Sequence, residues 1–114
     1  MTQESGEVAH YLFVISRDIG ADPSALFTIR SALALGRRRE EVAVFLIDDA
    51  CESVLRAAGA AVLARLVEAG VEVCTDDATL ERLARVSNVR GVKRGSADDL
   101  GARMLQPSVN TLWC

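Results

Sequence analysis

The sequence predicts an α/β protein: a three-layer sandwich around a mostly parallel five-stranded sheet, of the flavodoxin-like or Rossmann-like kind. Short apolar runs alternate along the chain with segments of helical pattern, as in proteins whose strands are joined by crossover helices. The composition agrees, because half of the 114 residues are hydrophobic while only three Phe, one Tyr and one Trp are present. Helices that pack on a sheet use such a mixture of Ala, Val and Leu.

The chain begins with a strand and a helix. Residues 10–16 form a near-continuous apolar run, which is typical of a strand buried on both faces. Asp22 followed by Pro23 predicts a helix start, with an N-cap and a proline in the first helical position. Gly36 is expected to end that helix.

The middle of the chain predicts two further strands. Residues 41–47 form the second, and the helical composition of residues 50–69 follows it. Gly59 interrupts this stretch, so we expect two helical pieces or a kink. Gly70 is expected to cap the second piece, and residues 71–75 read as the third strand because they are apolar and β-branched.

The last third repeats the alternation. Asp76 or Asp77 is expected to cap a helix, and a very short strand is expected around residues 91–93. Residues 96–99, Ser-Ala-Asp-Asp, resemble a capping box in which Asp replaces the usual Glu or Gln. Residues 109–113 form the last predicted strand. We expect a flexible lead over residues 1–9 and a single domain over residues 10–114.

Charge and cysteine content narrow the protein classes. The formal net charge is −3, and the only basic cluster, Arg37 to Arg39, reads as a helix cap, so we expect no nucleic-acid partner. No apolar run is long enough for a bilayer, and no signal-peptide pattern opens the chain. Three cysteines without C-x-x-C spacing argue against a disulfide framework. These features favour a cytoplasmic protein without membrane association.

The candidate site residues are the three cysteines. Cys74 is expected at the carboxyl end of the third strand, Cys114 at the end of the last, and Cys51 shortly after the second. Ligands bind at the carboxyl edge of open α/β sheets, so we expect all three thiols on that edge. The helix that starts after Cys74 would favour its thiolate. The alternative is that Cys74 is a buried small hydrophobic residue, as most free cysteines are.

Other site types fit the sequence poorly. The only histidine, His10, starts the first strand and so lies at the opposite edge, which excludes a Cys–His dyad within one subunit. Widely spaced cysteines make a weak zinc site. The first loop, residues 16–23, has one glycine and two acids, which disfavours NAD or ATP and excludes FMN less firmly. Asp48-Asp49 reads as a strand stop and helix cap, so we expect no metal and no cofactor.

The chain resembles the DsrE/DsrF-like sulfur-relay family over most of its length, from about Tyr11 to Trp113. Four stretches carry the resemblance, and the last two are the more specific. They are Asp22-Pro-Ser-Ala-Leu with the following Ile-Arg-Ser-Ala-Leu-Ala-Leu35, Glu41-Val-Ala-Val-Phe-Leu-Ile-Asp-Asp49, Glu68-Ala-Gly-Val-Glu-Val-Cys74, and Gly91-Val-Lys-Arg-Gly-Ser96 with Leu100.

The resemblance implies a parallel α/β sandwich that assembles into homo-oligomers, often trimers or hexamers. It also implies that Cys74 carries sulfur as a persulfide between donor and acceptor proteins. The segment after Cys74, Thr-Asp-Asp-Ala78, is more acidic than is usual for the family. Cys51 and Cys114 have no counterpart in its motif, and some members lack the cysteine and serve as structural subunits.

The sequence therefore favours a sulfur carrier or sulfurtransferase that holds sulfane sulfur on a strand-end cysteine, Cys74. We expect Lys93 and Arg94 to offset the acids after that cysteine. Cys114 is expected to be the poorer carrier because its own α-carboxylate disfavours the thiolate and a chain end is loosely held, although it is a candidate secondary acceptor. Two alternatives stay open. One is a non-catalytic structural or binding subunit, and the other is a thiol redox sensor in which Cys51 or Cys114 resolves a sulfenate on Cys74.

Overall fold

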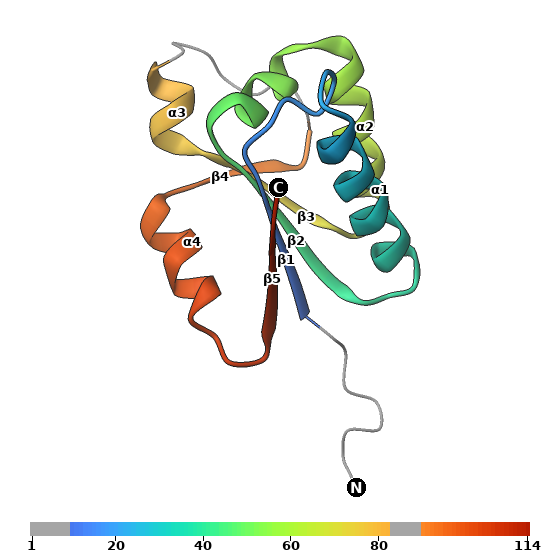
Figure 1. The fold of residues 1–114 in the computed structure, drawn as a ribbon, viewed down its shortest axis with the longest axis vertical. Coiled ribbons are helices and arrows are strands. Elements are labelled where there is room, and N and C mark those ends of the chain that lie inside the picture. The colour runs from blue at the N-terminus through green and yellow to red at the C-terminus, as the bar shows by residue number, and fades with distance from the viewer. Residues whose placement is uncertain (1–9, 83–89) are drawn as a thin grey trace, which may run out of the picture.

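The sheet is parallel throughout, as the alternation of strands and helices predicts. The computed structural model describes residues 10–82 and 90–114, so the expected flexible lead over residues 1–9 lies outside the described residues. The sheet order is β4-β3-β2-β1-β5, and every neighbouring pair is parallel (Figure 1). The strands are β1 (His10–Ile15), β2 (Glu41–Leu46), β3 (Glu72–Asp76), β4 (Val92–Gly95) and β5 (Val109–Trp113).

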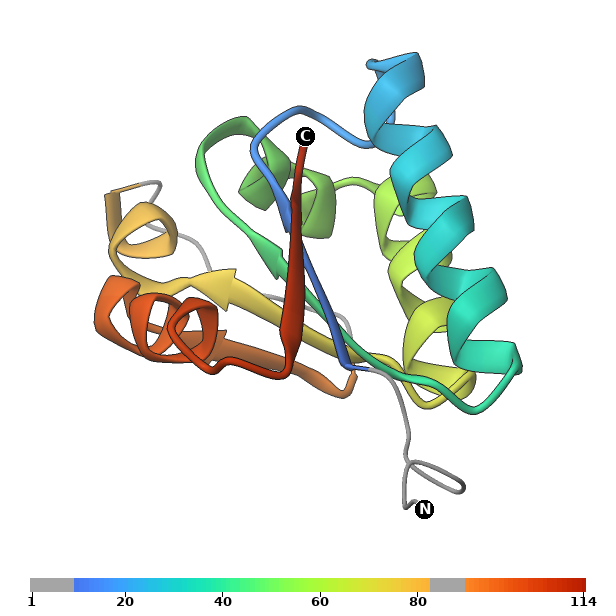
Figure 2. The same cartoon turned by 60° about the horizontal axis from the view of Figure 1, so that its bottom comes forward.

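Helices cover both faces of this sheet. They are α1 (Pro23–Arg37), the 3₁₀ helix η1 (Asp48–Leu55), α2 (Ala57–Glu68), α3 (Asp77–Arg82) and α4 (Ala97–Met104). Figures 1 and 2 place α1 and α2 side by side against one face and α4 against the other. We call these the α1/α2 face and the α4 face.

The sheet has a hydrophobic cluster on each of its two faces, because successive side chains of a strand point to opposite faces. The larger cluster lies on the α1/α2 face and includes residues of η1 and α3 as well as the sheet. The smaller cluster lies on the α4 face and consists of Leu12, Val14, Phe45, Cys74 and Leu100. The α4 face is therefore held together by far fewer buried side chains.

The first helix starts as predicted and ends one residue later. The Asp22 side chain accepts hydrogen bonds from the backbone of Ser24 and Ala25, and Pro23 opens the helix. Gly36 does not terminate the helix, which continues through Arg37. Its role is close packing instead, because a Cβ at Gly36 would lie 2.6 Å from Cγ2 of Val71.

The interruption expected at Gly59 falls slightly earlier in the chain. The helical stretch divides at Arg56 into η1 and α2, and Gly59 lies in the first turn of α2. A Cβ on Gly59 would stand 2.2 Å from the carbonyl oxygen of Ser53 in η1. The glycine thus allows the two pieces to pack against each other.

The last helix, α4, has a firm start and a narrow buried side. The backbone N–H of Asp99 donates to Oγ of Ser96 (3.1 Å), and the N–H of Ser96 donates to Oδ2 of Asp99 (3.0 Å), which is the predicted capping box. Leu100 is the one buried residue of this helix. No helix within the described ranges is long and apolar enough to cross a membrane.

Candidate functional site

Cys74 lies in the middle of β3, so its predicted position at the strand end is wrong. The ladder continues past it, with Thr75 paired to Arg94 and Asp76 paired to Gly95 on the edge strand β4. Thr75 is also paired with Leu46 of β2, and the pairing with β4 extends β3 by one residue beyond the predicted strand. The thiol is therefore presented from the face of the sheet rather than from its carboxyl edge.

The Cys74 side chain points to the α4 face and is almost fully covered. It belongs to the smaller core cluster beside Phe45 and Leu100, and 4% of the residue is exposed. It nevertheless lines a solvent-accessible hollow of about 330 Å³. The hollow is bounded by β3, β4 and α4, and its charged lining residues are Glu72, Lys93, Arg94, Asp99 and Arg103.

A carboxylate and two cations surround the thiol. Glu72 precedes Cys74 by two residues and so shares its face, with Oε2 of Glu72 lying 3.8 Å from Sγ of Cys74. Arg103 of α4 donates through both terminal nitrogens to the two oxygens of Glu72, at 2.8 and 2.5 Å. Nζ of Lys93 lies 3.5 Å from Oε2 of the same carboxylate. The carboxylate of Glu72 is thus held by both cations and contacts the thiol.

This environment makes Cys74 a weaker acid than an ordinary thiol. Burial is the main cause of its raised pKa, and the negative charge of Glu72 adds to it, while Arg103 and Lys93 act in the opposite direction. Hydrogen bonding to Arg103 holds the pKa of Glu72 below its usual range, so that carboxylate stays charged at neutral pH. The expected stabilisation of the Cys74 thiolate is therefore not supported by the structure.

The helix after β3 does not provide that stabilisation either. Oδ2 of Asp76 accepts hydrogen bonds from the backbone N–H of Thr79 (3.2 Å) and from its hydroxyl (2.5 Å), which confirms Asp76 as the cap of α3. Leu80 of α3 packs into the cluster on the α1/α2 face. The N-terminal turn of α3 therefore acts on Cys51 more than on Cys74, because Asp76 and Thr79 influence the pKa of Cys51.

The three cysteines are not brought together on one edge. Cys51 lies in η1, fully buried in the cluster of the α1/α2 face, and its thiol donates to the carbonyl of Leu46 (3.2 Å). Burial raises the pKa of Cys51 to about 11. Cys114 packs against the same cluster, so the sheet separates both thiols from Cys74. They do not meet because η1 packs Cys51 into the cluster on the α1/α2 face, whereas the Cys74 side chain points to the α4 face.

The backbone of Cys114 is also tied down, contrary to the expectation of a loose chain end. Its N–H donates to the carbonyl of Val14 (2.9 Å), and its carbonyl accepts from the N–H and the hydroxyl of Ser16, both at 2.9 Å. Three strand spacings separate β5 from β3, about 14 Å at ~4.8 Å each. Cys114 is therefore badly placed to take sulfur from Cys74 within one subunit.

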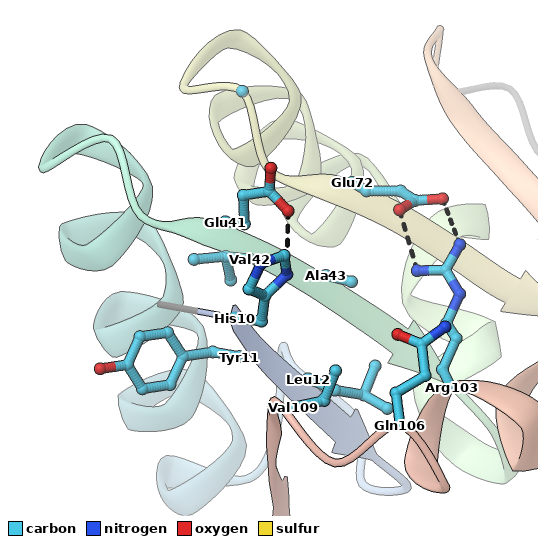
Figure 3. Close-up of a pocket in the computed structure, with 11 residues that line it drawn as sticks. His10, Tyr11, Leu12, Glu41, Val42, Ala43, Glu72, Arg103, Gln106 and Val109 are labelled. Atoms are coloured by element: carbon cyan, nitrogen blue, oxygen red, sulfur yellow. Dashed lines mark hydrogen bonds and ion pairs between the residues drawn. The ribbon is translucent and has the colours of Figure 1, made fainter. Parts of the chain in front are cut away.

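His10 lies at the amino edge of the sheet, as predicted, and Figure 3 shows its surroundings. Its Nδ1 lies 2.9 Å from Oε2 of Glu41, beside an open hollow of about 520 Å³. The strand register places Cys74 level with Val14, so His10 is about 13 Å away along the strands and about 10 Å across them. This separation excludes a direct Cys74–His10 dyad. In the described part of the chain, no three His, Cys, Asp or Glu side chains are grouped to hold a metal ion.

Two residues of the site were missed by the sequence reasoning. Glu72 was detectable, because residues two apart on a strand share a face and Cys74 was already a candidate. Arg103 was not, since only the packing of α4 on the sheet places it over β3. Lys93 and Arg94 were expected to offset the acids after Cys74. Arg94 forms the expected ion pair with Asp77, whereas Lys93 is paired in register with Cys74 and lies against Glu72 instead.

Comparisons with known proteins identify the fold. No model of a protein family matches the sequence, and no curated protein matches it. Among solved structures, the fold is similar to that of the ychN protein from E. coli, with a TM-score of 0.79 and 19% sequence identity. The similarity covers 92% of this chain and all of the ychN chain. At this identity the match shows the fold alone, a parallel five-stranded α/β sheet flanked by helices.

Proposed function

We propose that the protein is a sulfur carrier in which Cys74 holds a sulfane sulfur as a persulfide and passes it to a partner protein. The observation that carries the proposal is the position of this thiol. Cys74 lines a solvent-accessible hollow beside two cations, and the sheet separates it from Cys51 and Cys114. A persulfide formed there is protected from attack by a second thiol of the same chain.

The chemistry requires two displacements at sulfur and no change in the overall oxidation state. The Cys74 thiol loses its proton to solvent, and the thiolate attacks the outer sulfur of a donor persulfide. The donor S–S bond breaks, the donor thiolate leaves with the bonding pair, and Cys74-S-SH remains. An acceptor thiolate then attacks the outer sulfur, and the Cys74 thiolate leaves. Donor and acceptor are proposed to be partner proteins that present their own cysteines.

The hollow supplies two features that this cycle needs. Its volume of about 330 Å³ accommodates the additional sulfur atom, and its opening to solvent gives a partner cysteine a route to the site. Arg103 and Lys93 provide positive charge beside the persulfide, which is more acidic than a thiol and is therefore carried as an anion.

The test is sulfur loading followed by intact mass. After incubation with inorganic polysulfide we expect a gain of about 32 Da, one sulfur atom, on the native protein. Cys74→Ser should abolish the adduct, whereas Cys114→Ser and Cys51→Ser should retain it. Full loading of Cys74→Ser together with none on Cys114→Ser would overturn the assignment.

One observation favours a second candidate, a structural or binding subunit without sulfur chemistry. Cys74 is 4% exposed and its pKa is raised, which is what a buried, inert thiol shows. This candidate predicts no adduct on the native protein with any sulfane-sulfur donor. A redox sensor receives less support, because neither Cys51 nor Cys114 shares a face with Cys74.

A further inference from the structure

The ion pair over Cys74 has the form of an occupied anion site. Arg103 meets both oxygens of Glu72 in the side-by-side geometry that a guanidinium adopts with any planar or tetrahedral oxyanion. Lys93 adds a second positive charge on the same side of the carboxylate. In this structure the anion bound to Arg103 is the carboxylate of Glu72, which also lines the hollow.

The ion pair can be opened at modest cost. About a third of each side chain is exposed, 31% for Glu72 and 32% for Arg103, so solvent screens the attraction. Arg103 and Glu72 also line the second hollow, shown in Figure 3, whose lining does not include Cys74. Its volume of about 520 Å³ gives the displaced carboxylate room to move without disturbing the core.

We propose that Arg103 and Lys93 form a binding site for the oxyanion of a small sulfane-sulfur donor, and that Glu72 occupies this site in the resting protein. The donor class is a sulfane sulfur bonded to a group that carries a sulfonate or carboxylate. Thiosulfate is the simplest member. This inference rests on the proposed sulfur-carrier function and adds the chemical class of one donor to it.

The site orients such a donor for the same displacement. With its oxyanion on Arg103, the donor places its outer sulfur in the hollow that Cys74 lines. The Cys74 thiolate attacks that sulfur, the S–S bond breaks, and the oxyanion group leaves with the bonding pair. With thiosulfate the products are Cys74 persulfide and sulfite, so atoms and charge balance. When the product leaves, Glu72 returns to Arg103 and covers the persulfide.

Alkylation with a charged and a neutral reagent tests the site without requiring sulfur transfer. Iodoacetate carries a carboxylate, and iodoacetamide is its neutral analogue, so the ratio of their rates at Cys74 reports attraction of anions to this position. Glu72→Gln removes the internal anion and keeps the side-chain shape. We expect the iodoacetate-to-iodoacetamide ratio to rise about tenfold, because a unit charge within 4 Å of the thiol is lost while solvent screens only part of its effect.

Two further variants separate anion binding from a change in thiol acidity. The double variant Glu72→Gln/Arg103→Gln should return the ratio to the native value, since the gain depends on the freed guanidinium. Glu68→Gln, on the exposed side of α2, removes the same charge from a distant position and should leave the ratio unchanged. Continued protection of the buried Cys51 shows that each variant is folded.

The outcomes distinguish this inference from the proposed function. If Glu72→Gln accelerates both reagents equally, Glu72 affects only the acidity of the thiol and there is no anion site. If the ratio rises in the double variant as well, Arg103 is not the site. If the native protein takes up sulfur from polysulfide but Glu72→Gln leaves the ratio unchanged, the proposed sulfur-carrier function stands and the oxyanion donor class is wrong. A rise in the ratio without any persulfide leaves an anion site and overturns sulfur transfer.

Discussion

Leu100→Ala should expose Cys74 selectively, because Leu100 is the one buried side chain that holds α4 on the sheet. Replacing a buried leucine by alanine costs 2–5 kcal/mol in general. The low end applies here, since Leu100 is 8% exposed and lies at the margin of the smaller cluster. We therefore expect a loss of about 2 kcal/mol in the free energy that docks α4.

A weaker docking of α4 makes the Cys74 thiol more accessible to reagents. If α4 undocks locally, about 2 kcal/mol raises the open population about 30-fold, and the alkylation rate of Cys74 follows it. Cys51 lies in the other cluster and is reached through global unfolding. The labelling rate of Cys74 should thus rise about 30-fold over that of the native protein, which a brief iodoacetamide pulse with peptide mapping measures.

Leu66→Ala is the matched control. Leu66 is fully buried in α2, so this variant lowers the free energy of unfolding at least as much, as urea denaturation would measure. It leaves the docking of α4 untouched, so the labelling rate of Cys74 should stay near its native value, while that of Cys51, which is reached through global unfolding, should rise. An equal increase of the Cys74 rate in both variants, or no increase in Leu100→Ala, would show that α4 does not control access to Cys74.

Three further predictions follow from the described contacts. In the native protein, Cys74 should react with iodoacetamide faster than Cys51. Its rate should keep rising with pH beyond the range of an ordinary thiol because its pKa is raised. Labelling of Cys51 as fast as Cys74 would show that Cys74 is a buried, unreactive thiol. Gly59→Ala should destabilise the fold by about 2 kcal/mol through overpacking, whereas Gly101→Ala, whose Cβ meets nothing within 4 Å, should stabilise it by about 0.5–1 kcal/mol in thermal unfolding. We propose that the protein is a homo-oligomer, a trimer or hexamer, and expect the mass measured by light scattering to exceed the 12.2 kDa of one chain. Trp113→Asp removes a large exposed apolar side chain and should lower that mass.

The architecture was predictable from local sequence. Strand positions, the Asp22–Pro23 helix start, the Ser96–Asp99 capping box and the last strand, Val109–Trp113, agree with the structure. Each of these features depends on residues that are near one another in the chain. Hydrophobic periodicity, cap residues and turn glycines act over a few positions, so the sequence alone contains the information.

The site was predictable only in part. The sequence singled out Cys74 and predicted that Lys93 and Arg94 offset the acids after it, but it put the thiol at the strand end and grouped it with the other two cysteines. The pairing of β3 with β2 and with the short edge strand β4 decided the first point, because both ladders continue beyond Cys74. The packing of Cys51 and Cys114 against the α1/α2 face, while Cys74 points to the α4 face, decided the second.

What the sequence by itself determined is therefore the fold class, the element order and the identity of the candidate nucleophile. What only the tertiary structure decided is the chemical character of that nucleophile. The ion pair between Glu72 and Arg103 joins residues 31 positions apart, and α4 reaches β3 through packing on the sheet. Thiol acidity depends on burial and on charges within a few ångströms, and those distances are set by long-range packing rather than by neighbours in the chain.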